Sequence, residues 1–94
     1  MRDRYPALGH VLGAYFHGDA DGGPPGALEQ YVEDGARGAA EAAAEIDDLL
    51  ATVPDEELPR CSRLLGNSWE VERWGMNHRQ FFERLRETLR EHAR

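Results

Sequence analysis

The sequence has a single cysteine, no lysine and no long apolar run, and these absences exclude several classes of protein. Cys61 cannot form a disulfide within the chain, so the fold requires no oxidising compartment. No paired cysteines are present at the spacing that holds a structural zinc ion. The longest uncharged segments are shorter than the roughly 20 apolar residues that cross a bilayer. The sequence is therefore neither that of a zinc finger nor that of a membrane protein.

No export signal is visible in the sequence either. The apolar stretch after the charged N-terminus is interrupted by Gly9, His10 and Gly13 before it reaches the length of a signal-peptide core. We therefore expect a cytoplasmic protein.

β-Branched residues are scarce as well, since the chain has four valines and one isoleucine. No segment of five or more residues alternates apolar and polar side chains in the manner of a strand. A chain of 94 residues is large enough to bury one core. Residues 1–94 are therefore expected to form one domain built from helices.

Apolar side chains recur at helical spacing in five parts of the chain. The expected helices cover about residues 5–16, a short stretch from 28 to 35, residues 36–52, a segment between Pro54 and Gly66, and the stretch after Asn77. The connections are short, which favours antiparallel neighbours. The sequence thus predicts an all-α fold, a compact single-domain bundle of about five short antiparallel helices.

Three helix boundaries carry specific signals. The segment 18–26 is dense in glycine, aspartate and proline, which predicts a loop. Gly35 can adopt the left-handed conformation that ends a helix. Asn77, followed three residues later by Gln80, has the pattern of a capping box at the start of the last helix.

The start of the fourth helix has two interpretations. Asp55 can cap it, or Pro59 can mark its first turn. The expected apolar face of this helix consists of Leu58, Cys61, Leu64 and Leu65. A cysteine in such a face is more often a buried structural thiol than a reactive one.

Charge is unevenly distributed along the chain. Residues 19–57 contain twelve acidic side chains and only one basic residue, Arg37, whereas residues 58–94 contain eight arginines and five glutamates. An acidic face attracts basic partners and repels nucleic acid. The alternative is a solvated surface that keeps the protein soluble.

Few residues combine into a site with chemistry. His10, His17, Asp19 and Asp21 are possible ligands of zinc or manganese, but the alternative is that the aspartates organise a turn and His17 packs at a helix end. No nucleophile is paired with a base, and the neighbouring Asp47 and Asp48 diverge by roughly 100 degrees on a helix. We therefore expect a protein without catalytic activity or cofactor.

The tryptophans and the last helix each have two interpretations. Trp69 and Trp74 can be core residues or anchors of an interface, and a thin core favours the first. The arginines of the last helix could suggest nucleic acid. Glutamates between them instead indicate a salt-bridged, solvated face. The sequence therefore predicts no nucleic-acid partner.

Two short motifs near the N-terminus resemble a known family. Residues 5–9 are Tyr-Pro-Ala-Leu-Gly, and residues 13–17 are Gly-Ala-Tyr-Phe-His, with Asp19 following. This pattern resembles the immunity proteins of bacterial contact-dependent growth inhibition systems, and the similarity continues through an Ala/Glu-rich helix to the last helix. Where the family has Gln-Asp-Trp-Asp after the histidine, this chain has Gly18-Asp19-Ala20-Asp21 and lacks the aromatic residue.

The resemblance implies a protein that binds and neutralises a cognate toxin domain, which in many such systems is a nuclease. A basic substrate cleft would suit the acidic segment, because carboxylates can take the place of phosphates. The candidate toxin-binding residues are Asp19, Asp21, Glu29, Glu33 and Asp34. A small metal-binding module and a structural adaptor between proteins remain as alternatives.

Overall fold

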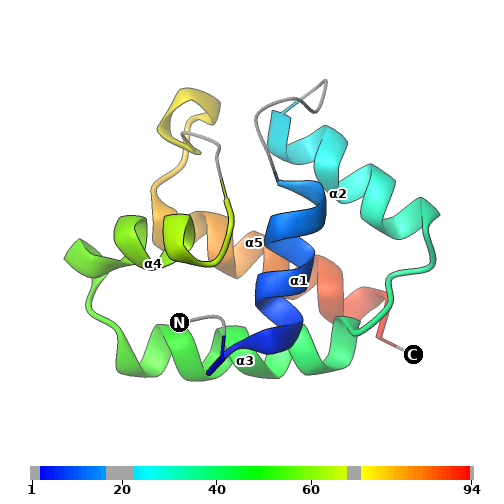
Figure 1. Cartoon of the computed structure of the whole chain (residues 1–94). Coiled ribbons are helices and arrows are strands. Elements are labelled where there is room, and N and C mark those ends of the chain that lie inside the picture. Colours follow the sequence, from blue (N-terminus) through cyan, green and yellow to red (C-terminus); the bar gives the residue numbers. More distant parts are fainter. Residues whose placement is uncertain (1–2, 17–22, 68–70, 94) are drawn as a thin grey trace.

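A computed structural model describes residues 3–16, 23–67 and 71–93 of the chain. The elements in order are α1 (Pro6–Tyr15), α2 (Gly23–Glu33), α3 (Ala39–Thr52), the 3-10 turn η1 (Asp55–Glu57), α4 (Leu58–Leu64), the 3-10 turn η2 (Val71–Trp74) and α5 (His78–Glu91) (Figure 1). The described residues contain no strand, and buried apolar side chains from all five α-helices form one core. The predicted all-α fold is confirmed.

Helix α3 is the central element, because α1 contacts it on one side and α5 on another (Figure 1). Its buried face consists of Ala39, Ala42, Ala43, Ile46 and Leu49. Three of these five residues are alanines, whose small side chains let a neighbouring helix approach closely. This buried face is the surface on which α1 and α5 pack.

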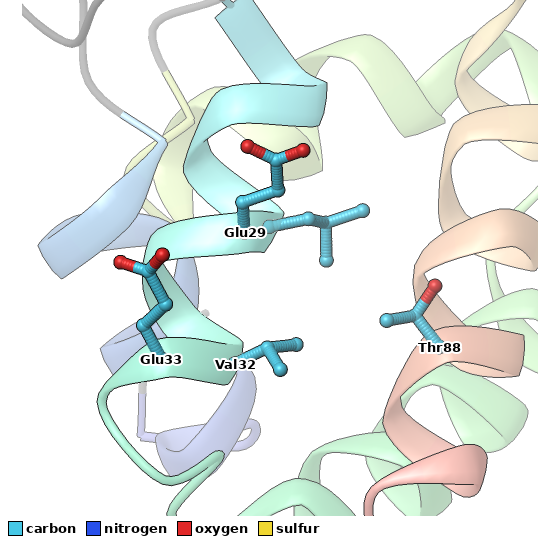
Figure 2. A pocket seen from close by; sticks show the side chains of 5 residues that line it. Glu29, Val32, Glu33 and Thr88 are labelled. Carbon is cyan, nitrogen blue, oxygen red and sulfur yellow. The ribbon is translucent and has the colours of Figure 1, made fainter.

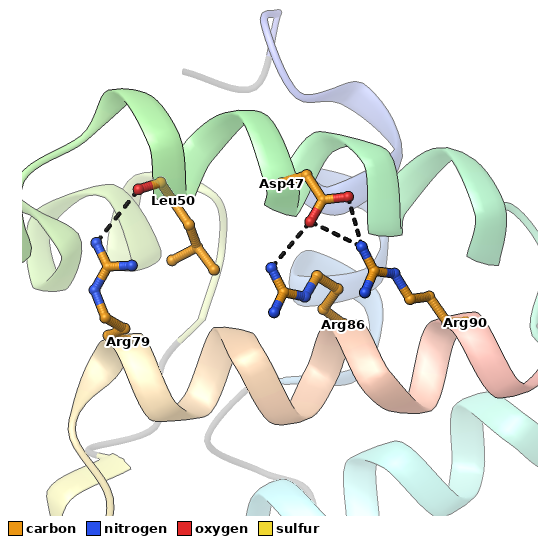
Figure 3. Close-up of polar contacts among 5 residues, drawn as sticks. All are labelled: Asp47, Leu50, Arg79, Arg86 and Arg90. Carbon is orange, nitrogen blue, oxygen red and sulfur yellow. Dashed lines mark hydrogen bonds and ion pairs between the residues drawn. The ribbon is translucent and has the colours of Figure 1, made fainter.

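Helices α3 and α5 run antiparallel, as their polar contacts show (Figure 3). Arg79, at the start of α5, donates to the carbonyl oxygen of Leu50, while Arg86 and Arg90 donate to Asp47 over 2.9 to 3.1 Å. Burial acts to raise the pKa of Asp47, but hydrogen bonds from Arg90 and Arg86 outweigh it and lower the pKa. Asp47 thus joins the two longest helices at their surface.

The start of α1 is capped by a side chain from α3. Glu45 accepts hydrogen bonds from the backbone N–H groups of Ala7 (3.2 Å) and Leu8 (2.8 Å), while the preceding residue, Tyr5, provides no side-chain cap. The Tyr5 hydroxyl instead donates to Asp48 over 2.6 Å. The first N–H groups of a helix have no partner within it, so Glu45 supplies the capping acceptor and a favourable charge.

Helix α2 begins earlier than the sequence predicts. Gly23 is its first residue, so the expected loop over 18–26 is wrong for residues 23–26. Pro24 and Pro25 follow in the first turn, where a missing N–H group costs no intrahelical hydrogen bond. Two prolines that look like a helix breaker in the sequence are therefore compatible with a helix start.

The end of α2 and the start of α3 are fixed by left-handed backbone. Gly35 has φ +100°, its N–H donates to Val32, and the N–H of Ala36 donates to Tyr31, which together form the Schellman motif that the glycine predicts. Ala36 and Gly38 also have positive φ. A helix cannot pass through these residues, so α3 begins at Ala39 and not at residue 36 as predicted.

The fourth helix begins at Leu58 with Pro59 as its second residue, which confirms the proline alternative. Asp55 lies in η1, makes no cap, and pairs with Arg79 at the start of α5. The carboxylate of Asp55, which the sequence suggests as a cap of α4, is thus engaged in an ion pair with a distant residue. This pair links η1 to α5.

One residue of the apolar face predicted for α4 is not buried. Leu58, Cys61 and Leu65 are buried, but Leu64 is 51% exposed. Helical periodicity places Ser62 between the buried positions instead, where its hydroxyl accepts a hydrogen bond from Asn67 over 2.8 Å. Burial raises the pKa of the Cys61 thiol, in keeping with a structural role.

The last helix starts as predicted, whereas one tryptophan does not lie where expected. Asn77 accepts from the N–H of Gln80, and the Gln80 side chain accepts from the N–H of Asn77. Trp74 lies in η2 and is 44% exposed. The prediction that it is a core residue is therefore wrong, and Val71 is the buried residue of that turn. Trp69 lies outside the described residues.

We predict that Glu45→Ala destabilises the protein by about 1–2 kcal/mol, because two N–H groups of α1 lose their acceptor. Urea unfolding measures the change. Glu41→Ala, at an exposed position on the same helix, is the control and should stay within about 0.5 kcal/mol of the wild type. Equal losses in both variants would show that Glu45 is not a special contact.

Tyr5 should make stability depend on alkaline pH. Burial and the hydrogen bond to Asp48 raise the pKa of Tyr5 from 10.0 to about 12. Because the unfolded chain ionises first, this contribution to stability is complete below pH 10 and is lost as pH rises from about 10 to about 12. Denaturant unfolding across this interval should show a smaller loss for Tyr5→Phe than for the wild type. A parallel loss in both proteins would contradict the assignment.

Candidate functional site

The structure divides the acidic residues of the segment 19–57 into two groups. Five accept hydrogen bonds or ion pairs within the molecule: Asp34, Glu45, Asp47, Asp48 and Asp55. Five others are exposed and contact no polar partner in the part of the chain that is described: Glu29, Glu33, Glu41, Glu56 and Glu57. Much of the acidity therefore holds the helices together, and only part of it is available to a partner.

Helix α2 presents three pairs of side chains, each pair one helical turn apart. The pairs are Ala27 and Tyr31, Leu28 and Val32, and Glu29 and Glu33. Successive residues are rotated by about 100 degrees on a helix, so the pairs form adjacent stripes. The first stripe is buried in the core, the second is half-buried and the third is exposed. The helix thus passes from core to solvent across its width.

An open groove of about 330 Å³ lies between α2 and α5, lined by Leu28, Glu29, Val32, Glu33 and Thr88. Figure 2 shows Val32 pointing across it toward Thr88, while the carboxylates of Glu29 and Glu33 do not point across it. Helix α2 packs mainly against α1, which leaves this side of it free of close helix packing. The groove therefore has an apolar floor, formed by Leu28 and Val32. Glu29 and Glu33 form its border on α2, which we call the acidic edge.

Asp34 faces a different direction from the acidic edge. Its carboxylate accepts hydrogen bonds from the hydroxyl of Tyr15 (2.7 Å) and from the amide of Gln30 (3.0 Å). The bond to Asp34 is the main cause that raises the pKa of Tyr15. Tyr15 also packs edge-to-face on Tyr31, with ring centroids 5.3 Å apart. Asp34 thus helps to attach α2 to α1.

The possible metal ligands are not brought together by the described structure. His10 is exposed on α1, whereas His17, Asp19 and Asp21 lie outside the described residues. Within the residues that the structure does describe, no three His, Cys, Asp or Glu side chains are placed to hold a metal ion. Asp19 and Asp21, the other two candidate toxin-binding residues, precede α2 in the sequence.

A second, smaller pocket of about 180 Å³ surrounds His78 at the start of α5. His78 is buried, and its Nδ1 lies 3.2 Å from a carboxylate oxygen of Glu72. Burial lowers the pKa of His78 despite this carboxylate. The other lining residues are Asp55, Pro59, Asn77 and Arg79, so the described lining contains no hydroxyl or thiol nucleophile. The contact between His78 and Glu72 joins η2 to α5, and the ion pair between Arg79 and Asp55 joins η1 to α5.

Sequence reasoning found the acids of the groove but missed its other wall. Glu29 and Glu33 were candidates because of their charge, and Leu28 and Val32 fall in the short helix expected from 28 to 35. Thr88 carries no sequence signal, since its place in the groove depends on how α5 packs. His78 was missed for the same reason.

A family model described as CdiI immunity protein matches residues 4–89. No curated protein and no solved structure matches the chain. Among the described residues, no helix has the length and apolar character needed to cross a membrane.

The acidic edge yields a prediction about stability. Glu29 and Glu33 are like charges one turn apart, and such pairs destabilise a helix by roughly 0.2–0.5 kcal/mol. The double variant Glu29→Gln, Glu33→Gln should therefore unfold at an equal or slightly higher urea concentration than the wild type. A clear loss of stability would mean that the two carboxylates have a structural role.

Proposed function

Because the chain belongs to the CdiI immunity protein family, we propose that it binds its cognate toxin domain through the acidic edge of the groove between α2 and α5. Family membership makes the chain a toxin-neutralising immunity protein whose partner is a protein. The acidic edge is the surface of contact in this proposal. The two proteins would meet in the cytoplasm, where an incoming or newly made toxin would be intercepted.

One observation carries the choice of surface. Glu29 and Glu33 are exposed, adjacent and free of ion pairs with the described residues, and they border an apolar groove. An unpaired pair of like charges costs stability, and a basic partner would remove that cost. Glu56 and Glu57 are also exposed, but they do not line this groove. Apolar area beside unpaired charge is the combination expected of a surface that closes on a partner.

The charge of the acidic edge suits a basic partner. A nuclease toxin would present arginine and lysine that otherwise bind phosphate, and carboxylates form strong charge-assisted hydrogen bonds with these side chains. Asp19 and Asp21, which precede α2 in the sequence, would add charge. Asp34 would contribute less, because Tyr15 and Gln30 already occupy its carboxylate.

Co-expression with the toxin domain encoded immediately upstream tests the proposed function. We expect the wild-type protein to restore growth of cells that make the toxin and to co-purify with it. Failure of both would sink the proposal, whatever the surface. Purified proteins then give the affinity as a function of salt.

The double variant Glu29→Gln, Glu33→Gln should bind the toxin domain about tenfold or more weakly at low salt, mainly through a slower association rate. Its affinity should also depend less on salt concentration, since fewer charges are neutralised. Glu56→Gln, Glu57→Gln is the matched control, because it removes the same charge from exposed residues of the same acidic segment. If both double variants bind equally, net charge and not the acidic edge governs association.

A further inference from the structure

We propose that the groove between α2 and α5 is an anchor pocket, which receives one apolar side chain from a segment of the toxin domain that also carries arginine or lysine. This inference rests on the proposed function and specifies the chemistry of the partner. It assigns the groove floor a role in holding the complex, separate from the role of the acidic edge in forming it.

The floor of the groove has the composition of such a pocket. Leu28 and Val32 are half-buried, line the groove and lie one helical turn apart. Thr88 faces Val32 from α5 (Figure 2). Ala27 and Tyr31, from the neighbouring stripe of α2, lie in the core, and Leu28 packs partly against it. Leu28 and Val32 are only half-buried, so both leave apolar surface uncovered. Covering that surface on binding contributes roughly 25 cal/mol for each Å² removed from water.

The size of the groove limits what can occupy it. Its volume of about 330 Å³ lies at the lower end of the 300–1,000 Å³ typical of ligand pockets. That space accommodates an aromatic or branched aliphatic side chain. Aromatic side chains that fill a central, desolvated pocket are among the residues that contribute most to binding at protein interfaces.

Charge complementarity defines the residues that flank the anchor. Glu29 directly follows Leu28, and Glu33 directly follows Val32, so the acidic edge runs parallel to the floor. Four residues of helix rise by about 6 Å, which sets the distance along α2 between the two carboxylate-bearing positions. A partner segment with basic side chains at a similar spacing, on one side of its apolar anchor, would satisfy both surfaces at once. A purely apolar segment would leave the carboxylates unpaired.

The two surfaces should act on different steps of binding. Charges accelerate association and lose their effect as salt increases, whereas a buried apolar anchor slows dissociation and is insensitive to screening. Filling the groove should therefore weaken the complex at low and high salt alike. This behaviour separates the anchor pocket from the acidic edge.

Thr88→Phe tests the pocket, because the larger side chain fills the groove from the α5 side. We expect the variant to bind the purified toxin domain at least about tenfold more weakly, with a faster dissociation rate, at both low and high salt. Thr52→Phe is the matched control, since Thr52 is exposed at the end of α3, outside the groove residues. Circular dichroism and urea unfolding verify that both variants are folded.

Val32→Ala provides a second test if Thr88→Phe fails to fold, because it removes apolar floor without adding bulk. It should speed dissociation without changing the salt dependence of association. Normal dissociation rates in every folded groove variant, while Glu29→Gln, Glu33→Gln still weakens binding, would overturn the anchor pocket and leave the proposed function intact. Absence of wild-type binding would overturn both. A wild-type dimer that Thr88→Phe converts to monomer would identify a second copy of the chain as the occupant and overturn the inference.

Discussion

The hydrogen bonds from α1 to Glu45 are the contact on which the arrangement of the helices depends. A carboxylate on α3 caps α1. Helix α1 in turn contacts α2 and the residue after it, because Tyr15 packs on Tyr31 and donates a hydrogen bond to Asp34. On the other side of α3, Asp47 holds α5. Both walls of the groove are thus positioned by acidic residues of one helix, although that helix lines none of it.

The fold was largely predictable because its signals are local. The periodicity of the helices and the capping box of Asn77 and Gln80 depend on residues a few positions apart, and both are confirmed. The errors occur where a distant contact or an unusual backbone decides the outcome. Asp55 pairs with Arg79 and does not cap α4, and positive φ at Ala36 delays α3. Neither effect can be seen in the sequence of the segment itself.

The candidate site was predictable in its charge but not in its shape. Composition identified the acidic segment, yet it treated Glu45, which caps a helix, and Glu33, which has no partner among the described residues, as equivalent. Only packing separates them. The groove itself joins α2 to Thr88, 55 positions after Glu33 in the sequence, and no pattern within either helix indicates that they meet.

The separation of structural from exposed acids has an evolutionary consequence. Within the described structure, Glu29 and Glu33 take no part in capping or in the core, so we expect their replacement to leave the fold intact. Because the scaffold tolerates change at these positions, successive substitutions can match the protein to an altered toxin while Glu45 and Asp47 stay constant. The residues that match the protein to its partner can then change, while other residues of the same short chain maintain the architecture.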